Sequence, residues 1–386
     1  MLWCLALLLP GCIDPYMPDA ISSTRSYLVV DGFINSAGIT TINLSRTYDI
    51  AAKGSPPVEA RATVYIEEEG ATTRYTLTES TVRGTYTSAS LRLNPSKNYR
   101  LHILTATGKD YASSYVPAKV TPPIDAVTWR TNSEGLNVYV NSHDDTNNTQ
   151  YYQWDYEETW EIIPIYRPAW EYVNRVMRRI VVPYPTICWG NQRSSRIEVG
   201  KTTSLSRDVV ADYRVRNFSA TSERLNSRYS ILVRQYALTR DEYAYWELLK
   251  KNTENIGTLF DPLPAQLTGN IKCLNDNEEL ALGYIGAHTV EQRRIFIARR
   301  DLPTNLNVPN GYESCVPTDT VSLYPRGIER PPSPAEILQV YFSNPNYLPI
   351  DNILDDNLRV IGYTAKSRDC IDCRTRGTAV KPSFWP

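Results

Sequence analysis

Short runs in which apolar and polar residues alternate recur through the first third of the chain. Such runs are typical of β-strands with one buried face, and Gly, Pro or Asn lies between most of them. In the run at 60–68, for example, Ala62, Val64 and Ile66 share one face. We predict strands at 27–34, 40–48, 60–68, 73–80, 83–89, 99–107 and 110–118. Their spacing predicts an immunoglobulin-like or transthyretin-like sandwich over residues 26–121.

A second set of strands follows Pro122-Pro123, which favours an extended connection and marks a domain boundary. We predict these strands at 126–131, 135–142, 150–163, 229–239, 279–288 and 293–300. The proline-rich tail at 301–386 is predicted to be irregular. The chain is therefore expected to be mostly β and to have two domains, the N-terminal sandwich and a larger β-rich domain over 124–386.

One helix is predicted near 240–255, inside the second domain. Thr239-Arg240-Asp241-Glu242 forms a capping box, whose side chains satisfy the first free N–H groups of a helix. Tyr243, Trp246 and Leu249 then recur at helical spacing, and Asn255 and Gly257 provide a stop.

The apolar run at residues 2–9 is too short for a membrane span, which takes roughly 20 residues. It has the length of the apolar part of a secretory signal. Leu9-Pro10-Gly11-Cys12 resembles a bacterial lipobox. We predict a lipoprotein signal peptide at 1–12, lipidation of Cys12 and a tether at 13–25. The alternatives are a plain cleaved signal and a buried N-terminal strand.

Composition excludes one class of partner and agrees with export. The 386 residues carry a net charge of −1, so there is no basic footprint for nucleic acid. Beyond Cys4 and Cys12, five cysteines remain, and an odd number favours two disulfides and one free thiol without fixing the pairs. The candidate disulfide cysteines are Cys188, Cys273, Cys315, Cys370 and Cys373.

Metal and cofactor chemistry is not indicated. Cys370-Ile371-Asp372-Cys373 could be a redox pair or half of a zinc site, but none of the three histidines lies near a cysteine in the sequence. We predict a structural disulfide, no metal and no cofactor. The Asp/Asn-rich segments at 144–148 and 276–279 lack EF-hand spacing and are interpreted as turns.

Carboxylates beside aromatic residues raise the possibility of a glycosidase, which needs two such groups. In the run at 150–163, strand alternation places Asp155, Glu157 and Glu161 on one face and Glu158 on the other. Glu157 and Glu161 would be the acidic pair of a surface hydrolase. The alternative is a solvated strand edge whose charges deter pairing.

Residues 164–196 have no regular period and are rich in Arg, Tyr, Trp and Pro. Aromatic residues and Arg are enriched at interface hot spots, and Arg can clamp carboxylates. The alternative is a strand pair that covers the core of the second domain. The predicted binding surface consists of Tyr166, Arg167, Trp170, Tyr172, Arg175, Arg178 and Trp189.

Several motifs together resemble a family of Bacteroidota lipoproteins, domain of unknown function 4249. They are Leu28-Val29-Val30-Asp31-Gly32, Tyr99-Arg100-Leu101 with Gly108-Lys109-Asp110-Tyr111, Pro122-Pro123-Ile124-Asp125, Glu242-Tyr243-Ala244-Tyr245-Trp246, Leu259-Phe260-Asp261-Pro262, Gly269-Asn270-Ile271, Leu282-Gly283-Tyr284, and the ending Cys370-Ile371-Asp372-Cys373-Arg374 with Lys381-Pro382-Ser383-Phe384-Trp385. The resemblance implies an outer-membrane lipoprotein of the kind that often accompanies TonB-dependent receptors, and it implies no catalytic residues. Asp319-Thr320-Val321 also resembles an O-glycosylation acceptor of exported proteins in this phylum, which makes Thr320 a candidate.

We therefore expect a non-catalytic outer-membrane lipoprotein that is held to the membrane by its N-terminal lipid. Its expected role is a surface binding or accessory subunit of a TonB-dependent uptake system, with a glycan or peptide ligand and no nucleic acid. One alternative is a surface hydrolase that uses Glu157 and Glu161. Another is a structural or adhesion protein of the envelope.

Overall fold

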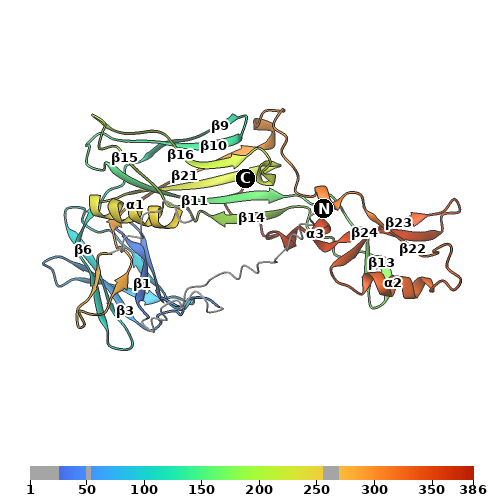
Figure 1. Cartoon of the computed structure of the whole chain (residues 1–386), viewed down its shortest axis with the longest axis horizontal. Coiled ribbons are helices and arrows are strands. Elements are labelled where there is room, and N and C mark those ends of the chain that lie inside the picture. Colours follow the sequence, from blue (N-terminus) through green and yellow to red (C-terminus); the bar gives the residue numbers. More distant parts are fainter. Residues whose placement is uncertain (1–25, 49–53, 255–268) are drawn as a thin grey trace, which may run out of the picture. The chain divides into compact units, whose positions relative to one another are not determined.

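A computed structural model describes residues 26–48, 54–254 and 269–386 (Figure 1). The chain divides into two compact units. The first contains the chain up to Pro117 together with 266–287, and the second contains 118–265 and 288–386. The predictions of a mostly β chain, two β-rich parts and a helix near 240–255 are confirmed.

The first unit is built on one sheet, in the order β18-β7-β6-β3-β4-β5-β2-β1 with β19 beside β1. Two short strands at the unit boundary, β8 (Val116–Lys119) and β20 (Ala287–His288), follow β1 in the sheet, and β8 also pairs with β6, so the sheet closes on itself. The other strands are β1 (Leu28–Asn35), β2 (Ile39–Arg46), β3 (Thr63–Glu68), β4 (Arg74–Glu79), β5 (Thr85–Ser90), β6 (Asn98–Leu104), β7 (Asp110–Ser113), β18 (Ile271–Cys273) and β19 (Ala281–Leu282).

The alternation read from the sequence produces the core of this unit. Tyr99, Leu101 and Ile103 of β6 are buried, and the residues between them are half-buried. Ile42 and Leu44 of β2 are buried in the same alternating way. Burying one face of each strand is what holds a closed sheet together.

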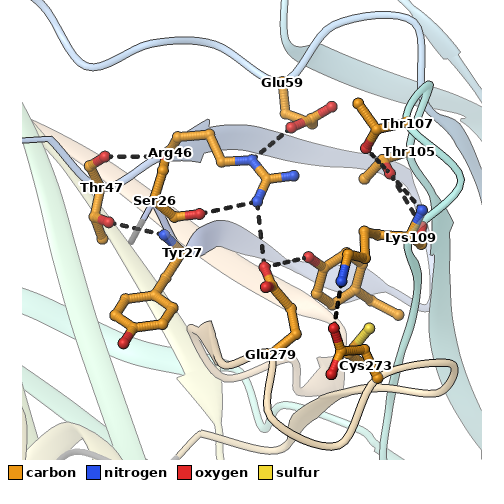
Figure 2. A network of polar contacts seen from close by, with 12 residues as sticks. Ser26, Tyr27, Arg46, Thr47, Glu59, Thr105, Thr107, Lys109, Cys273 and Glu279 are labelled. Atoms are coloured by element: carbon orange, nitrogen blue, oxygen red, sulfur yellow. Dashed lines mark hydrogen bonds and ion pairs between the residues drawn. The ribbon is translucent and has the colours of Figure 1, made fainter. Parts of the chain in front are cut away.

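Residues 269–287 belong to the first unit, although the sequence predicts them to lie in the second domain. The physical reason is strand pairing: β18 pairs with β7, and β19 runs parallel to β1. Ion pairs secure the same segment. Figure 2 shows the Arg46 guanidinium between two carboxylates, with Nε 2.6 Å from Glu59 and Nη1 3.5 Å from Glu279. Such non-local contacts leave no periodic signal in the sequence.

The second unit has a three-stranded sheet, β16-β10-β9, and a five-stranded sheet, β14-β11-β17-β21 with β15 on β11. Buried residues of both sheets share one core, which includes Val138 of β10, Trp154 of β11 and Val233 of β17. The strands are β9 (Ile124–Asn132), β10 (Gly135–Asp144), β11 (Tyr151–Ile162), β14 (Cys188–Arg193), β15 (Glu198–Lys201), β16 (Asp208–Ser219), β17 (Arg228–Ala237) and β21 (Val290–Ala298).

The predicted helix is α1 (Arg240–Glu254). Its first turn is capped as expected, because the Glu242 N–H donates to Thr239 Oγ1 at 3.2 Å. The predicted stop at Asn255 and Gly257 lies outside the described residues. No helix in the described ranges is long and apolar enough to span a membrane.

The tail is not irregular, so that prediction is wrong. It contributes β22 (Asp319–Ser322), β23 (Tyr347–Leu354), β24 (Val360–Ser367), α2 (Pro334–Phe342) and α3 (Arg368–Ile371). Its prolines sit where these elements tolerate them. Pro334 occupies the first position of α2, where a missing N–H costs nothing. Pro349 lies beside a register shift in β23.

A small module joins this tail to the hairpin of β12 (Trp170–Val173) and β13 (Val176–Arg179). We call β12, β13, β22, β23, β24 and α2 the tail module. Val321, Ile337, Phe342 and Tyr363 form its buried core, and Trp170 of the hairpin packs against them.

One disulfide ties the tail to the rest of the second unit, and a second one closes a loop within the tail. Cys188 pairs with Cys373 and Cys315 pairs with Cys370, while Cys273 is a buried free thiol in the first unit. The predicted count of two disulfides and one free cysteine is confirmed. The two cysteines of the C-I-D-C motif are both disulfide-bonded, but not to each other.

Candidate functional site

A pocket of about 280 Å³ lies at the C-terminal end of β11, and we call it the β11-end pocket. Four separate segments of the second unit supply its walls: the end of β11, the short 3-10 helix at Glu223–Leu225, the loop at 310–312, and the tail near Arg376. Its lining residues are Trp160, Glu161, Ile162, Ile163, Glu223, Asn226, Asn310 and Arg376. Polar and charged side chains thus outnumber apolar ones.

The disulfides fix the walls of this pocket. Cys315 follows the 310–312 loop, and Cys373 precedes Arg376 in the chain. All four bonded cysteines pack in one buried cluster with Ile162 and Tyr312, and Trp160 lies against that cluster. A disulfide restricts the segments that it joins. The pocket therefore rests on covalently tied loops, which favours a preformed site.

Glu161 is the first carboxylate of the pocket. It accepts a hydrogen bond from Ser227 Oγ at 2.6 Å and another from Trp385 Nε1 at 2.9 Å. Trp385 is buried, and its ring meets Phe296 edge-on. Trp385, near the end of the described chain, therefore orients a carboxylate at the C-terminal end of β11.

Glu223 is the second carboxylate, and it lies 3.7 Å from Arg376 Nη1. Arg376 also donates to the Gly311 carbonyl at 2.6 Å and stacks over the Tyr312 ring at 4.2 Å. Gly311 has a φ of +77°, and a Cβ there would lie 1.8 Å from Glu223 Oε2. The positive φ favours glycine at this wall of the pocket. The two carboxylates and one guanidinium give the lining a net charge of −1.

Trp160 offers little of its ring to a ligand. The indole covers Gly190 of the paired strand β14, where a Cβ would lie 2.4 Å from Trp160 Cε2. The Arg224 guanidinium stacks over the same ring, 4.3 Å from its centroid. The β11-end pocket thus lacks an open aromatic platform.

Sequence reasoning identified Glu161 but missed four polar members of this pocket: Glu223, Asn226, Asn310 and Arg376. They are far apart in the chain and belong to no motif. The one local signal is that Asn310 and Arg376 lie close to disulfide cysteines, and this signal becomes readable only once the pairing is known.

Glu158, one of the predicted carboxylates, has a structural role. It is 2 % exposed and pairs with Arg216 Nε at 3.0 Å and Arg224 Nη1 at 2.6 Å. The Tyr229 hydroxyl donates to it at 2.9 Å, and burial together with this carboxylate raises the pKa of Tyr229 well above its usual value. A buried charge with three partners is a stabilising element, because losing a partner leaves an unpaired ion.

The proposed acidic pair, Glu157 and Glu161, is not brought together in one site. Glu157 accepts from Asn191 Nδ2 at 2.9 Å and is not part of the β11-end pocket. Asp155 pairs with Arg234 Nε at 2.5 Å. The structure instead brings Glu161 and Glu223 into one pocket, and no motif in the sequence predicts this pair.

The aromatic members of the predicted binding surface are engaged in packing. Trp170 meets Tyr363 edge-on and donates to Asn352 Oδ1 at 3.2 Å, and Tyr172 contacts Phe342. Tyr166 donates to the Cys315 carbonyl at 2.8 Å. These contacts agree with the alternative of a strand pair that covers a core.

The remaining members of that surface differ in exposure. Arg167, Arg175 and Arg178 are exposed, and Arg178 pairs with Glu171 at 2.8 Å. Trp189 is half-buried and exchanges backbone hydrogen bonds with Thr378. Binding through the three arginines stays a prediction.

The acidic side chains of the oxygen-rich turns accept hydrogen bonds from backbone N–H groups of the same turns. Partial burial opposes ionisation of Asp144, but hydrogen bonds from Thr146, Asn148 and Thr149 outweigh it and lower its pKa to about 2. A hydrogen bond from Lys109 likewise lowers the pKa of Asp276. No group of three or more His, Cys, Asp or Glu residues in the described ranges could hold a metal ion.

Two predicted modification sites remain untested. Cys12 lies outside the described residues. Thr320 is exposed on β22, where it pairs with Thr364 of β24.

Comparisons with known proteins identify a family. A family model described as a domain of unknown function (DUF4249) matches residues 13–294. No curated protein matches the chain. Among solved structures, the chitinase ChiA74 from Bacillus thuringiensis is similar at 11 % identity with a TM-score of 0.14, over 45 % of this chain and 29 % of the chitinase. A likeness this low says nothing about function.

Proposed function

We propose, for a chain that belongs to the family described as a domain of unknown function (DUF4249), the role of a non-catalytic binding protein of the outer membrane. In this proposal a lipid on Cys12 anchors it, and it acts as an accessory subunit of a TonB-dependent uptake system. The observation that carries the binding role is the β11-end pocket, which has a polar lining and two walls next to disulfide-bonded cysteines.

Two observations support export to the cell envelope. Disulfides persist in oxidising compartments, and this chain has two of them in its second unit. The apolar run at residues 2–9 has the length of an export signal, and Cys12 follows it after Pro10 and Gly11. Together they support a protein that leaves the cytoplasm and is anchored at its N-terminus.

The non-catalytic part of the proposal rests on how the carboxylates are used. Asp155, Glu157 and Glu158 each have a fixed hydrogen-bond or ion-pair partner. A hydrolase at the β11-end pocket would have to use Glu161 and Glu223, and these are held by Trp385 and Arg376. Partners of this kind suit carboxylates that orient a ligand. An envelope protein without a ligand is the remaining alternative, and binding measurements separate the two.

The anchor is tested by intact-mass analysis of protein isolated from its native membranes. We expect the mature chain to begin at a lipidated Cys12 and to fractionate with the outer membrane. A Cys12→Ser chain is the matched control and should lose both properties. An unmodified Cys12 in the mature protein would overturn the proposed location.

A further inference from the structure

The β11-end pocket contains polar groups that the protein leaves without a partner. Asn226 is half-buried, and within the described residues its side-chain amide makes no hydrogen bond. Asn310 accepts one hydrogen bond, from the Tyr312 N–H at 2.7 Å, so its amide nitrogen remains available. An amide of this kind can both donate and accept. The pocket therefore offers hydrogen-bonding capacity that a ligand could use.

The charge of the lining restricts the ligand. Glu161 and Glu223 face the pocket with a single cation, Arg376, and Arg376 already lies 3.7 Å from Glu223. A phosphate or carboxylate would meet two anions and a guanidinium that is partly neutralised. Like charges at such distances are repulsive. Anionic ligands are therefore disfavoured.

The shape and chemistry of the lining restrict it further. Because Gly190 and Arg224 cover Trp160, a ligand cannot stack on that ring as an aromatic compound would. A cavity of about 280 Å³ is near the lower limit for small-molecule sites, which start at roughly 300 Å³. Carboxylates accept hydrogen bonds, the guanidinium group donates them, and side-chain amides do both. A ligand with several hydroxyl groups matches all three, because each hydroxyl also donates and accepts.

We infer that the β11-end pocket binds a neutral polyhydroxylated ligand the size of one sugar ring, through its hydroxyl groups. The inference rests on the proposed function and gives it a ligand class. Asn226 and Asn310 contact hydroxyls through their amides, and Glu223, paired with Arg376, accepts a hydrogen bond from a hydroxyl. Ile163 and the edge of Trp160 border the apolar side of the ring.

The test is ligand-observed saturation-transfer NMR on the mature chain, followed by calorimetry. The probes are methyl α-D-glucopyranoside, methyl β-D-galactopyranoside and methyl α-D-mannopyranoside. Glucose 6-phosphate reports on anions and lysine methyl ester on cations. We expect saturation transfer to at least one methyl glycoside and none to the phosphate or the ester.

Variants then place the binding in this pocket. Asn226→Ala should weaken the binding of the responding glycoside about 5- to 10-fold, the effect of losing a hydrogen bond or two. The matched control is Asn307→Ala, at an exposed position outside the pocket, and it should bind as the wild type does. Unchanged tryptophan fluorescence in both variants shows that they are folded.

Three results would overturn the ligand class: no transfer to any glycoside, transfer to lysine methyl ester alone, or glycoside binding that Asn226→Ala leaves unchanged. None of these results contradicts the proposed function. That function is tested by the modification state of Cys12 and by the proteins that co-purify from the membrane. A chain that is lipidated and co-purifies with a membrane partner, yet shows no saturation transfer to the glycosides, would refute the ligand class and leave the proposed function standing.

Discussion

The disulfide between Cys315 and Cys370 gives a sharp test of how the second unit is held together. The two cysteines are 55 residues apart, and this loop lies inside the longer one closed by Cys188 and Cys373. In the chain-entropy model, a loop of this length restricts the unfolded chain by roughly 4 kcal/mol. Replacing both cysteines, Cys315→Ser with Cys370→Ser, should lower the free energy of unfolding of this unit by about that amount.

Tryptophan fluorescence during denaturant unfolding measures this loss in the correct unit. The described tryptophans all lie in the second unit, at Trp129, Trp154, Trp160, Trp170, Trp189, Trp246 and Trp385. Their emission should change when that unit unfolds, and the midpoint of the transition should fall in the double variant.

The matched control is Cys273→Ser, which alters a buried thiol of the first unit that forms no disulfide. We expect the tryptophan transition of this control to be unchanged. A loss below about 1 kcal/mol in the double variant would refute the reasoning, because the tail would then be held by its packing and not by the cross-link. Weaker glycoside binding by the same variant would connect this bond to the pocket wall.

Three further predictions concern the carboxylates. Glu158→Gln should destabilise the second unit by about 3–5 kcal/mol, because Arg216 and Arg224 lose their buried counter-ion; the exposed Glu134→Gln is the control, and equal unfolding midpoints for the two would contradict this. Because the pKa of Asp144 is lowered, its contribution is present above about pH 4 and is lost as the pH falls toward 2. Asp144→Asn should therefore cost on the order of 1 kcal/mol at pH 7, since solvent screens this half-buried group, and clearly less at pH 2, where the carboxyl is partly protonated; a pH-independent difference in unfolding free energy would argue against it. Finally, aryl glycoside hydrolysis should be at background in the wild type and in the Glu157→Gln, Glu161→Gln double variant, whereas a rate abolished by these changes would favour a hydrolase.

The strands were predictable because burial of one face requires apolar and polar residues to alternate along the sequence. Ala62, Val64 and Ile66 alternate with polar residues, and Val64 and Ile66 are indeed buried in β3. The start of α1 was predictable for a similar reason, since Thr239 is a local capping signal that needs no distant partner. Each of these signals lies within a few residues of the structure that it specifies.

The high proline content of residues 301–386 predicts irregular structure, and this prediction fails for the tail module. Pro334 instead begins α2, preceded by a capping box between Ser333 and Glu336 that could have been read from the sequence. The packing of Trp170 against Tyr363 could not have been read in this way. It joins segments that are distant in the chain and share no period.

The β11-end pocket could not be predicted from the sequence either, because it also joins segments that are distant in the chain. Its walls come from segments that are distant in the chain, and residue types alone do not choose among the possible pairings of the cysteines near two of them. Likewise, strand alternation places Glu158 on the face opposite Glu157, but its burial is not predictable, because its partners, Arg216 and Arg224, come from other elements. Short stretches of sequence therefore predict strands and helices, whereas the pocket and the buried ion pairs depend on contacts between elements that are distant in the chain.

The central claim is that this protein works at the outer membrane as a binding subunit of an uptake system. Affinity purification of the full chain from its native membranes, with mass spectrometry of the bound proteins, tests this most directly. We predict that a TonB-dependent receptor co-purifies with the wild type and is lost from the Cys12→Ser control. Recovery of the same proteins with both chains, and no receptor among them, would contradict the claim.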